Sequence, residues 1–381
     1  MSRYMSGLEN LESVADRLRG RRLGLMTNGT GMNRAFLSTV DVLRSRFQLT
    51  SLFAVEHGID GSLAPGESFG SGVDRRTGLP VYSVYEGNHR LTEEMLATFD
   101  TFVYDIQDVG ARFYTYLYAL SLAMEECAKA GKPVVVLDRV NPLGGDIIQG
   151  TVLDERFASY VGMYALPTRY GLTIGEYALW VKDHLKLDLD LTVVPMTGWR
   201  RRDGAEAMAR YWVAPSPNCA TLHAARAYIG TCVFEGSNVS EGRGTTLPFE
   251  QIGAPWIDAY ELERAMAAHA GETPGMAFRA GWFIPSVSKH AGEKCGGVRI
   301  FLTDPNRADP VLGALLLMDE IRRLYPDRFA WIQEDGRYVI DRLLGTDTYR
   351  TGMYDGAALM AAHEPMRRAF EEERKPFLLY E

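Results

Sequence analysis

Residues 234–255, FEGSNVSEGRGTTLPFEQIGAP, gather several carboxylates and one arginine on a stretch with few core-forming side chains. The carboxylates are Glu235, Glu241 and Glu250, and the arginine is Arg243. The apolar residues follow neither the period of a strand nor that of a helix, so we predict a loop. Loops of this kind carry function more often than stability.

A second candidate group follows the apolar run LTSLFAV at residues 49–55. Glu56 comes directly after it, and a glutamate beside apolar walls is partly desolvated, which raises its pKa and suits a general acid. The alternative is a structural role as a helix cap or an ion-pair partner. His57 is predicted to share the site, because histidine titrates nearest neutral pH.

Other chemistries lack their motifs. The chain has no HExxH, GxGxxG or Walker A sequence, and no two of its four cysteines have a CxxC spacing. We therefore expect no metal and no cofactor. Carboxylate chemistry remains, in which one group protonates a leaving oxygen and another guides water, and this describes glycoside hydrolysis.

The elements that must position these groups are predicted from four apolar runs separated by helical patterns. The runs cover residues 22–28, 49–58, 101–110 and 133–145, and the helical patterns cover 34–46 and 111–130. Continuous apolar strands alternating with helices predict an α/β fold with a Rossmann-like parallel sheet covered on both faces. Ligands of such sheets bind outside the carboxyl ends of the strands.

Polar residues follow each of these strands, and we expect them to bind substrate. They are Asn28, Asp108, Arg139 and Asn141. Arg112 lies one helical turn after Asp108, and this pair is either structural or orients a sugar hydroxyl. For each residue singly, capping of the next helix is the alternative.

We predict two domains, residues 1–160 with the parallel sheet and a smaller α+β domain at 161–381 that completes the cleft. Thr173 and Glu176 predict a capping box at the start of a helix, and residues 190–196 predict a strand of the second domain. No apolar stretch is long enough to span a bilayer or to form a signal peptide, so we expect a cytoplasmic protein with no membrane contact. A secreted form remains possible if a leader has been removed. The net charge of −8 argues against nucleic-acid partners.

Several motifs in one order resemble a known family over about residues 20–380. They are VEHGIDG, DIQDVGARFYTY, LDRVNPLGG, PTRYGLTIGEYA, PSPNCAT, YIGTCVFEGSNVSEGRGTTLPFEQIGAP and FIPSVSKHAGEKCGGVRIFLTD. The family is that of the NamZ-like exo-β-N-acetylmuramidases. The resemblance implies release of N-acetylmuramic acid from the non-reducing end of peptidoglycan-derived MurNAc-GlcNAc saccharides, in a cleft between two domains. It implies Glu56 and His57 as the catalytic pair.

The resemblance also implies roles for residues of the loop at 234–255. Glu235 or Glu241 would supply a second catalytic carboxylate, and Asn238 and Ser240 would bind sugar hydroxyls. Arg243 would pair with the lactyl carboxylate of muramic acid. The alternative is that Arg243 forms an internal ion pair with one of the two glutamates.

Three positions depart from the family pattern as we expect it. Val55 and Val140 stand where we expect proline, and Tyr170 stands where we expect histidine, which could alter a ligand contact. Two questions stay open at this point. The second catalytic group is either a carboxylate that activates water or the acetamido oxygen of the substrate. The competing functions are a non-catalytic binder of cell-wall amino sugars and a nucleotide-dependent enzyme.

Overall fold

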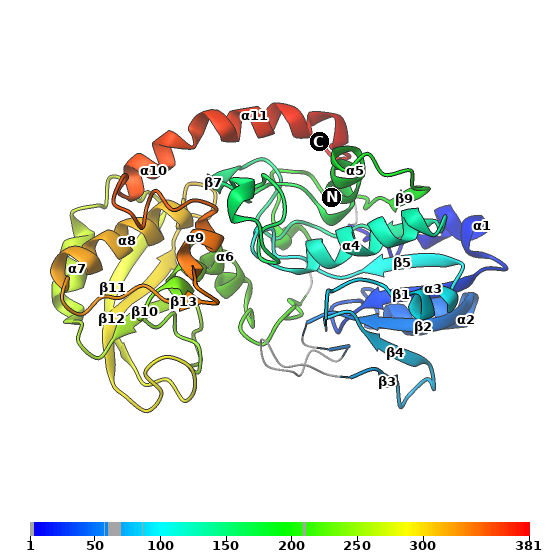
Figure 1. Cartoon of the computed structure of the whole chain (residues 1–381), viewed down its shortest axis with the longest axis horizontal. Helices are drawn as coiled ribbons and strands as arrows, with labels where there is room; N and C mark the ends of the chain where they lie inside the picture. Colours follow the sequence, from blue (N-terminus) through cyan, green and yellow to red (C-terminus); the bar gives the residue numbers. More distant parts are fainter. Residues whose placement is uncertain (1–3, 57, 60–69, 86, 209–210) are drawn as a thin grey trace.

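The protein forms two domains that lie side by side, and its two C-terminal helices form an arch over them (Figure 1). The computed structural model describes residues 4–56, 58–59, 70–85, 87–208 and 211–381. His57 lies outside these ranges. The two ends of the described chain meet the same domain, since Met5 bridges to Thr197 and the main chain of Arg201 donates to Glu381.

The first domain is built on a seven-stranded sheet in the order β3-β4-β2-β1-β5-β6-β9. The strands are β1 (Arg22–Thr27), β2 (Gln48–Ala54), β3 (Gly72–Val73), β4 (Pro80–Ser83), β5 (Thr101–Asp105), β6 (Val134–Leu137) and β9 (Leu191–Val194). All neighbours pair in parallel except β3 and β4. The strand order therefore reverses between β1 and β5, as in Rossmann-like sheets, and confirms the predicted fold class.

Helices cover both faces of this sheet, which explains the continuous apolar strands. Val103 and Val135 face a core of leucines from the first helical turns and α2 (Thr39–Arg46). Phe102 and Val134 face the opposite core, against α3 (Glu93–Ala97), α4 (Tyr116–Lys129) and α5 (Ile174–His184). A strand buried on both sides has no polar face to show in its sequence.

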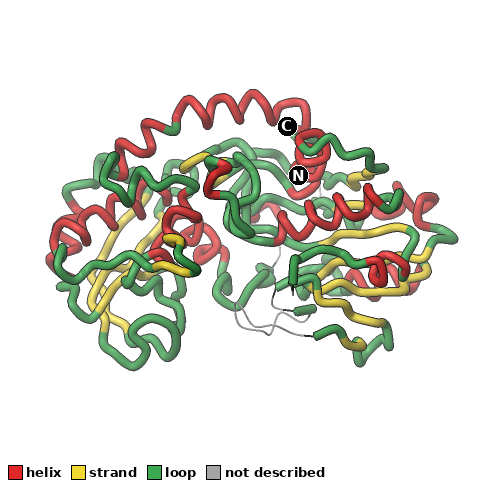
Figure 2. Tube along the Cα trace, in the orientation of Figure 1, coloured by secondary structure: helices red, strands yellow, loops and turns green. Residues whose placement is uncertain are grey.

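The second domain has a three-stranded antiparallel sheet in the order β10-β12-β11. Its strands are β10 (Gln251–Ala254), β11 (Met276–Phe283) and β12 (Cys295–Leu302), and its helices are α6 (Leu222–Thr231), α7 (Ala259–Ala267), α8 (Pro310–Leu324), α9 (Val339–Leu344) and α10 (Gly356–Ala362). Two short ribbons pair β7 (Gln149–Val152) with β8 (Pro167–Arg169) and β13 (Gln333–Glu334) with β14 (Arg337–Tyr338). Figure 2 shows helices and strands gathered in each domain, with long loops between them.

The sheet of the first domain extends beyond the predicted boundary at residue 160. The strand predicted at 190–196 forms as β9, but it pairs with β6 rather than with the second sheet. The crossover helix α5 has the predicted capping box of Thr173 and Glu176. We therefore place the end of the first domain after β9.

The C-terminal helix α11 (Glu364–Arg374) returns the chain to the first domain (Figure 1). Arg374 Nη1 donates to the carbonyls of Gly145 and Gly171, at 2.7 and 2.6 Å. Tyr380 then donates to the buried carboxylate of Asp138. This return holds the end of the second domain against the loops that follow the sheet.

Two predicted helices begin later than the sequence indicated. The pattern at 34–46 starts its helix at Thr39, where Ser38 accepts a hydrogen bond from the amide of Asp41. The pattern at 111–130 starts its helix at Tyr116. Within the described ranges, the protein has no helix that is long and apolar enough to cross a membrane.

Candidate active site

A pocket of about 160 Å³ lies between the two domains and contains carboxylates from both. Glu56 follows β2, and Thr115 and Tyr116 begin α4, which follows β5. Glu235 and Arg243 reach the pocket from the second domain, with Tyr228 of α6. The pocket therefore lies outside the carboxyl ends of β2 and β5, next to the point where the strand order reverses.

Two hydroxyl groups hold the carboxyl group of Glu56. Tyr85 Oη donates to Oε1 at 3.2 Å, and Thr115 Oγ1 donates to Oε2 at 3.1 Å. Thr115 is the N-cap residue of α4, but its side chain makes no capping bond and reaches Glu56 instead. Burial raises the pKa of Tyr85 to about 12, and the nearby charge of Glu56 adds to this shift, so the phenol stays protonated at neutral pH.

An aromatic cluster lies beside Glu56. The ring of His89 stacks on Tyr160, with centroids 3.9 Å apart and planes 12° apart, and the Tyr85 ring is 5.5 Å away. Burial lowers the pKa of His89, although the charge of Glu56 opposes this shift. The imidazole therefore stays largely neutral at neutral pH and can pack against a tyrosine face.

The second-domain side of the site is a network of four charges. Arg243 Nη2 lies 2.5 Å from Glu235 Oε1, and its Nε lies 3.2 Å from Glu241 Oε1. Lys289 Nζ lies 2.9 Å from Glu241 Oε2. Burial raises the pKa of Glu235, and Arg243 opposes this shift. Two carboxylates and two cations balance, so the internal ion pair considered for Arg243 is present.

The loop that carries Arg243 requires the two glycines beside it. Gly242 and Gly244 have φ angles of 79° and 76°, a region that side chains disfavour. A Cβ atom on Gly244 would lie 2.5 Å from the carbonyl oxygen of Val287. Arg243 itself lies over the ring of Phe249, 5.0 Å from its centroid. The sequence GRG thus fixes the direction of the guanidinium.

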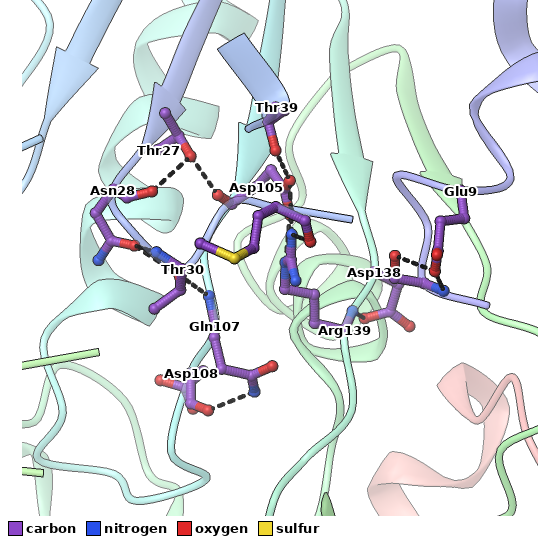
Figure 3. A network of polar contacts seen from close by, with 12 residues as sticks. Glu9, Thr27, Asn28, Thr30, Thr39, Asp105, Gln107, Asp108, Asp138 and Arg139 are labelled. Carbon is purple, nitrogen blue, oxygen red and sulfur yellow. Dashed lines mark hydrogen bonds and ion pairs between the residues drawn. The ribbon is translucent and has the colours of Figure 1, made fainter. Parts of the chain in front are cut away.

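The polar residues after the strands mostly bind each other, as Figure 3 shows. Asn28 Oδ1 accepts hydrogen bonds from the amide and hydroxyl of Thr30, at 2.9 and 2.6 Å. Arg139 forms a buried ion pair with Asp105, in which Nη2 lies 2.8 Å from Oδ2. Neither Asn28 nor Arg139 lines the pocket that contains Glu56.

Asp108 and Asn141 are buried in the same way. Asp108 Oδ2 accepts hydrogen bonds from the amide of Gly110 and from the hydroxyl of Tyr170. Burial raises the pKa of Asp108 to about 6. Tyr170, the departure from the family pattern, therefore contacts a buried carboxyl group and does not line the pocket. Asn141 bonds to the main chain of Leu143 and Leu172.

The other residues predicted to bind substrate also form hydrogen bonds with main-chain groups. The buried guanidinium of Arg112 donates to the carbonyls of Thr151, Leu166 and Leu343, at 2.9, 3.0 and 2.6 Å. It makes no ion pair with Asp108 among the described contacts. Asn238 bonds to the main chain of residues 328 and 330, and the Ser240 hydroxyl accepts from the amide of Gly242.

Sequence reasoning missed several groups that the fold brings to the candidate carboxylates Glu56 and Glu241. Tyr85 and Thr115 donate hydrogen bonds to Glu56, but they lie 29 and 59 residues after it in the sequence. Lys289 approaches Glu241 from 48 residues away. The run RFYTY at residues 112–116 was the available signal for Thr115, because it directly follows a strand and its turn. In the described part of the chain, no cluster of three or more metal-ligating side chains occurs.

Two family models and a curated relative match nearly the whole chain. Residues 23–223 match the family described as exo-beta-N-acetylmuramidase NamZ, N-terminal, and residues 226–380 match its C-terminal counterpart. A curated relative, the peptidoglycan beta-N-acetylmuramidase NamZ of Bacillus subtilis (strain 168), is 41% identical over 99% of this chain and 92% of its own length.

Two crystal structures of DUF1343 family proteins from Bacteroides fragilis share the fold. One has a TM-score of 0.91 at 32% identity and covers 100% of this chain and 99% of its own. The other has a TM-score of 0.78 at 28% identity, with 99% of each chain covered. The motifs, the two domains and these matches agree, and the chain belongs to the NamZ family of exo-β-N-acetylmuramidases.

Proposed function

We propose that this protein hydrolyses the β-glycosidic bond of a non-reducing terminal N-acetylmuramic acid in peptidoglycan fragments, with MurNAc-GlcNAc saccharides as substrates. The observation that carries the proposal is the pocket between the domains. There a carboxyl group from each domain lines one small cavity, Glu56 from the first and Glu235 from the second. Most enzymes that hydrolyse glycosidic bonds use such a pair of carboxyl groups.

Glu56 acts as the general acid in this proposal. A hydroxyl group can donate to a carboxylate or accept from a carboxylic acid. Tyr85 and Thr115 can therefore hold Glu56 both before and after it protonates the leaving oxygen. The carboxyl group keeps one orientation through the step, which places its proton toward the glycosidic oxygen.

Glu235 acts as the second carboxylate, in preference to Glu241. Glu235 lines the pocket, whereas Glu241 is 2% exposed and is held by two cations. Burial raises the pKa of Glu235, which makes it a better base, and the charge of Arg243 opposes this shift by favouring the ionised form. Arg243 then has the role of holding Glu235, because its charge is already matched by the two glutamates. It is not proposed as the partner of the lactyl carboxylate.

The leaving group of the substrate tests these roles. A general acid matters little when the leaving group is a weak base, such as a nitrophenolate. We expect Glu56→Gln to lose about 10²- to 10⁴-fold in kcat on a MurNAc-GlcNAc disaccharide and much less on a nitrophenyl muramide. Glu235→Gln should lose a similar factor on both substrates. Equal losses on both substrates in Glu56→Gln would remove it from the acid role, and saccharide binding without any turnover by the wild type would favour a binding protein.

A further inference from the structure

A second, larger cavity lies on the other side of α6 from Glu56. Its volume is about 710 Å³, within the range of about 300–1,000 Å³ that small-molecule sites occupy. Tyr228 lines the Glu56 pocket, whereas Arg226 and Ile229 of the same helix line this cavity. The first domain contributes its other wall, through Arg169 and the loop 198–204.

Arginines dominate the charged lining of this cavity, which we call the arginine pocket. They are Arg169, Arg200, Arg202 and Arg226. Two of them are neutralised by carboxylates of the same lining. Arg200 lies 3.0 Å from Asp203, and Arg226 lies 2.5 Å from Glu206. Among the described residues, Arg169 and Arg202 have no ion-pair partner, so the pocket retains two unmatched positive charges.

Arg169 is the buried member of the arginine pocket, with 5% of its surface exposed. Its Nη1 donates to Gln149 Oε1 at 2.9 Å, its Nη2 donates to the carbonyl of Leu143, and its Nε has no partner in the described part of the chain. Burial lowers the pKa of Arg169 to about 10, and the like charge of Arg226 lowers it further. The charge of Asp309 opposes this shift, but its carboxylate caps α8.

The other buried arginines show why Arg169 is different. Arg139 and Arg201 each pair with a buried carboxylate, Asp105 and Glu176. Arg112 and Arg374 pair with none, but each donates to at least three main-chain carbonyls. Among the described contacts, Arg169 donates to one main-chain carbonyl and one side-chain amide oxygen, and it lines an open cavity. A buried charge without a counter-ion is costly, and an anion in the cavity would offset that cost.

We propose that the arginine pocket is a second binding site, which takes a small organic anion that carries a carboxylate or a phosphate group. The planar forks of Arg169 and Arg202 suit either group, since both present paired oxygens. Leu143, Ile229 and Pro310 supply apolar wall for the body of such a molecule. Because both domains line the pocket, the ligand would contact both at once.

Calorimetric titration of the full chain tests this site with three probes at constant ionic strength. Citrate represents the carboxylate, glucose 6-phosphate represents the phosphate, and glucose is the neutral control. We expect at least one anion to bind the wild type while glucose does not, and the anion that binds identifies the preferred group. The proposal would be overturned if neither anion bound at concentrations up to about 10 mM, which corresponds to a binding free energy weaker than about −2.7 kcal/mol.

Matched variants locate the binding. Arg202→Gln alters an exposed side chain that lines the pocket, and Arg307→Gln removes the same charge from an exposed site outside the lining. We expect Arg202→Gln to weaken the anion about tenfold, equivalent to about 1.4 kcal/mol, and Arg307→Gln to leave it unchanged. Arg169→Gln should abolish binding, and Arg202→Gln decides the matter if that variant does not fold. Equal weakening in Arg202→Gln and Arg307→Gln would contradict the assignment. Hydrolysis of a nitrophenyl muramide should be unchanged by Arg202→Gln.

Discussion

Replacement of Arg243 with glutamine removes the cation closest to the proposed second catalytic carboxylate. In the folded chain, Arg243 lies 2.5 Å from Glu235 and 3.2 Å from Glu241. Lys289 remains beside Glu241 in the variant, at 2.9 Å, so Glu235 loses far more of its compensation than Glu241 does. The ionised form of Glu235 becomes less favourable, and its pKa rises.

The exposure of the pair sets the size of this effect. Loss of one partner costs about 3–5 kcal/mol in a fully buried ion pair and about 0.2–1 kcal/mol in an exposed one. The Arg243 and Glu235 side chains are 21% and 29% exposed, so we take about 2 kcal/mol, between these limits. At about 1.36 kcal/mol for each pKa unit, the pKa of Glu235 rises by roughly 1.5 units.

The pH dependence of kcat measures this shift directly. A carboxylate that acts as a base must be ionised, so activity is lost as the pH falls through its pKa. A higher pKa moves this acidic limb upward, and we expect a move of about one to two pH units in Arg243→Gln. Arg243→Lys should restore part of it, and Lys289→Gln should move the limb less, because Lys289 contacts Glu241. An acidic limb that stays in place in Arg243→Gln would refute the role of Glu235.

Three further expectations follow from single side chains. Tyr85→Phe removes one hydrogen bond to Glu56, of about 1–1.5 kcal/mol, and should lower kcat about tenfold with little change in KM. Asp108→Asn removes a group whose pKa is raised from 3.8 to about 6, so its protonation stabilises the wild type below pH 4 and this contribution is lost as the pH rises through 6. Urea unfolding should therefore show that the free energy of unfolding of the variant, relative to that of the wild type, rises by up to about 3 kcal/mol between pH 4 and 7. A difference that stays constant with pH would contradict the raised pKa of Asp108. Arg112→Met leaves three main-chain carbonyls without their donor and should cost at least about 3 kcal/mol in the free energy of unfolding, with KM unchanged; a raised KM at normal stability would instead indicate a substrate contact.

The sequence predicted the layers of the first domain because its strands are buried on both faces. The runs that became β1, β2, β5 and β6 are continuous and apolar, and only helices on both sides of a sheet explain such runs. It placed β9 in the wrong domain, because pairing partners depend on the crossover through α5 and not on the strand itself. The helix predicted from residue 34 begins only at Thr39, after the cap residue Ser38, a start that the apolar pattern alone did not indicate.

The same limit applies to the site. The sequence identified Glu56, Glu235 and Arg243, which do line one pocket, because strand ends and glycine-rich loops are local features. It also predicted substrate contacts for Arg112 and Asn238, whose side chains bind main-chain groups from distant segments. Hydrogen bonds between segments more than 50 residues apart leave no local pattern. His57 lies outside the described residues, so its predicted role stays a prediction.

The most direct test of the account is the release of N-acetylmuramic acid by the purified protein. The substrates are 4-nitrophenyl N-acetyl-β-muramide and the corresponding glucosaminide, with a MurNAc-GlcNAc disaccharide alongside and Glu235→Gln as the matched variant. We expect release from the muramide and the disaccharide, none from the glucosaminide, and a large loss in the variant on both active substrates. Equal release from the glucosaminide, or full activity in Glu235→Gln, would contradict the proposed substrate or the proposed site.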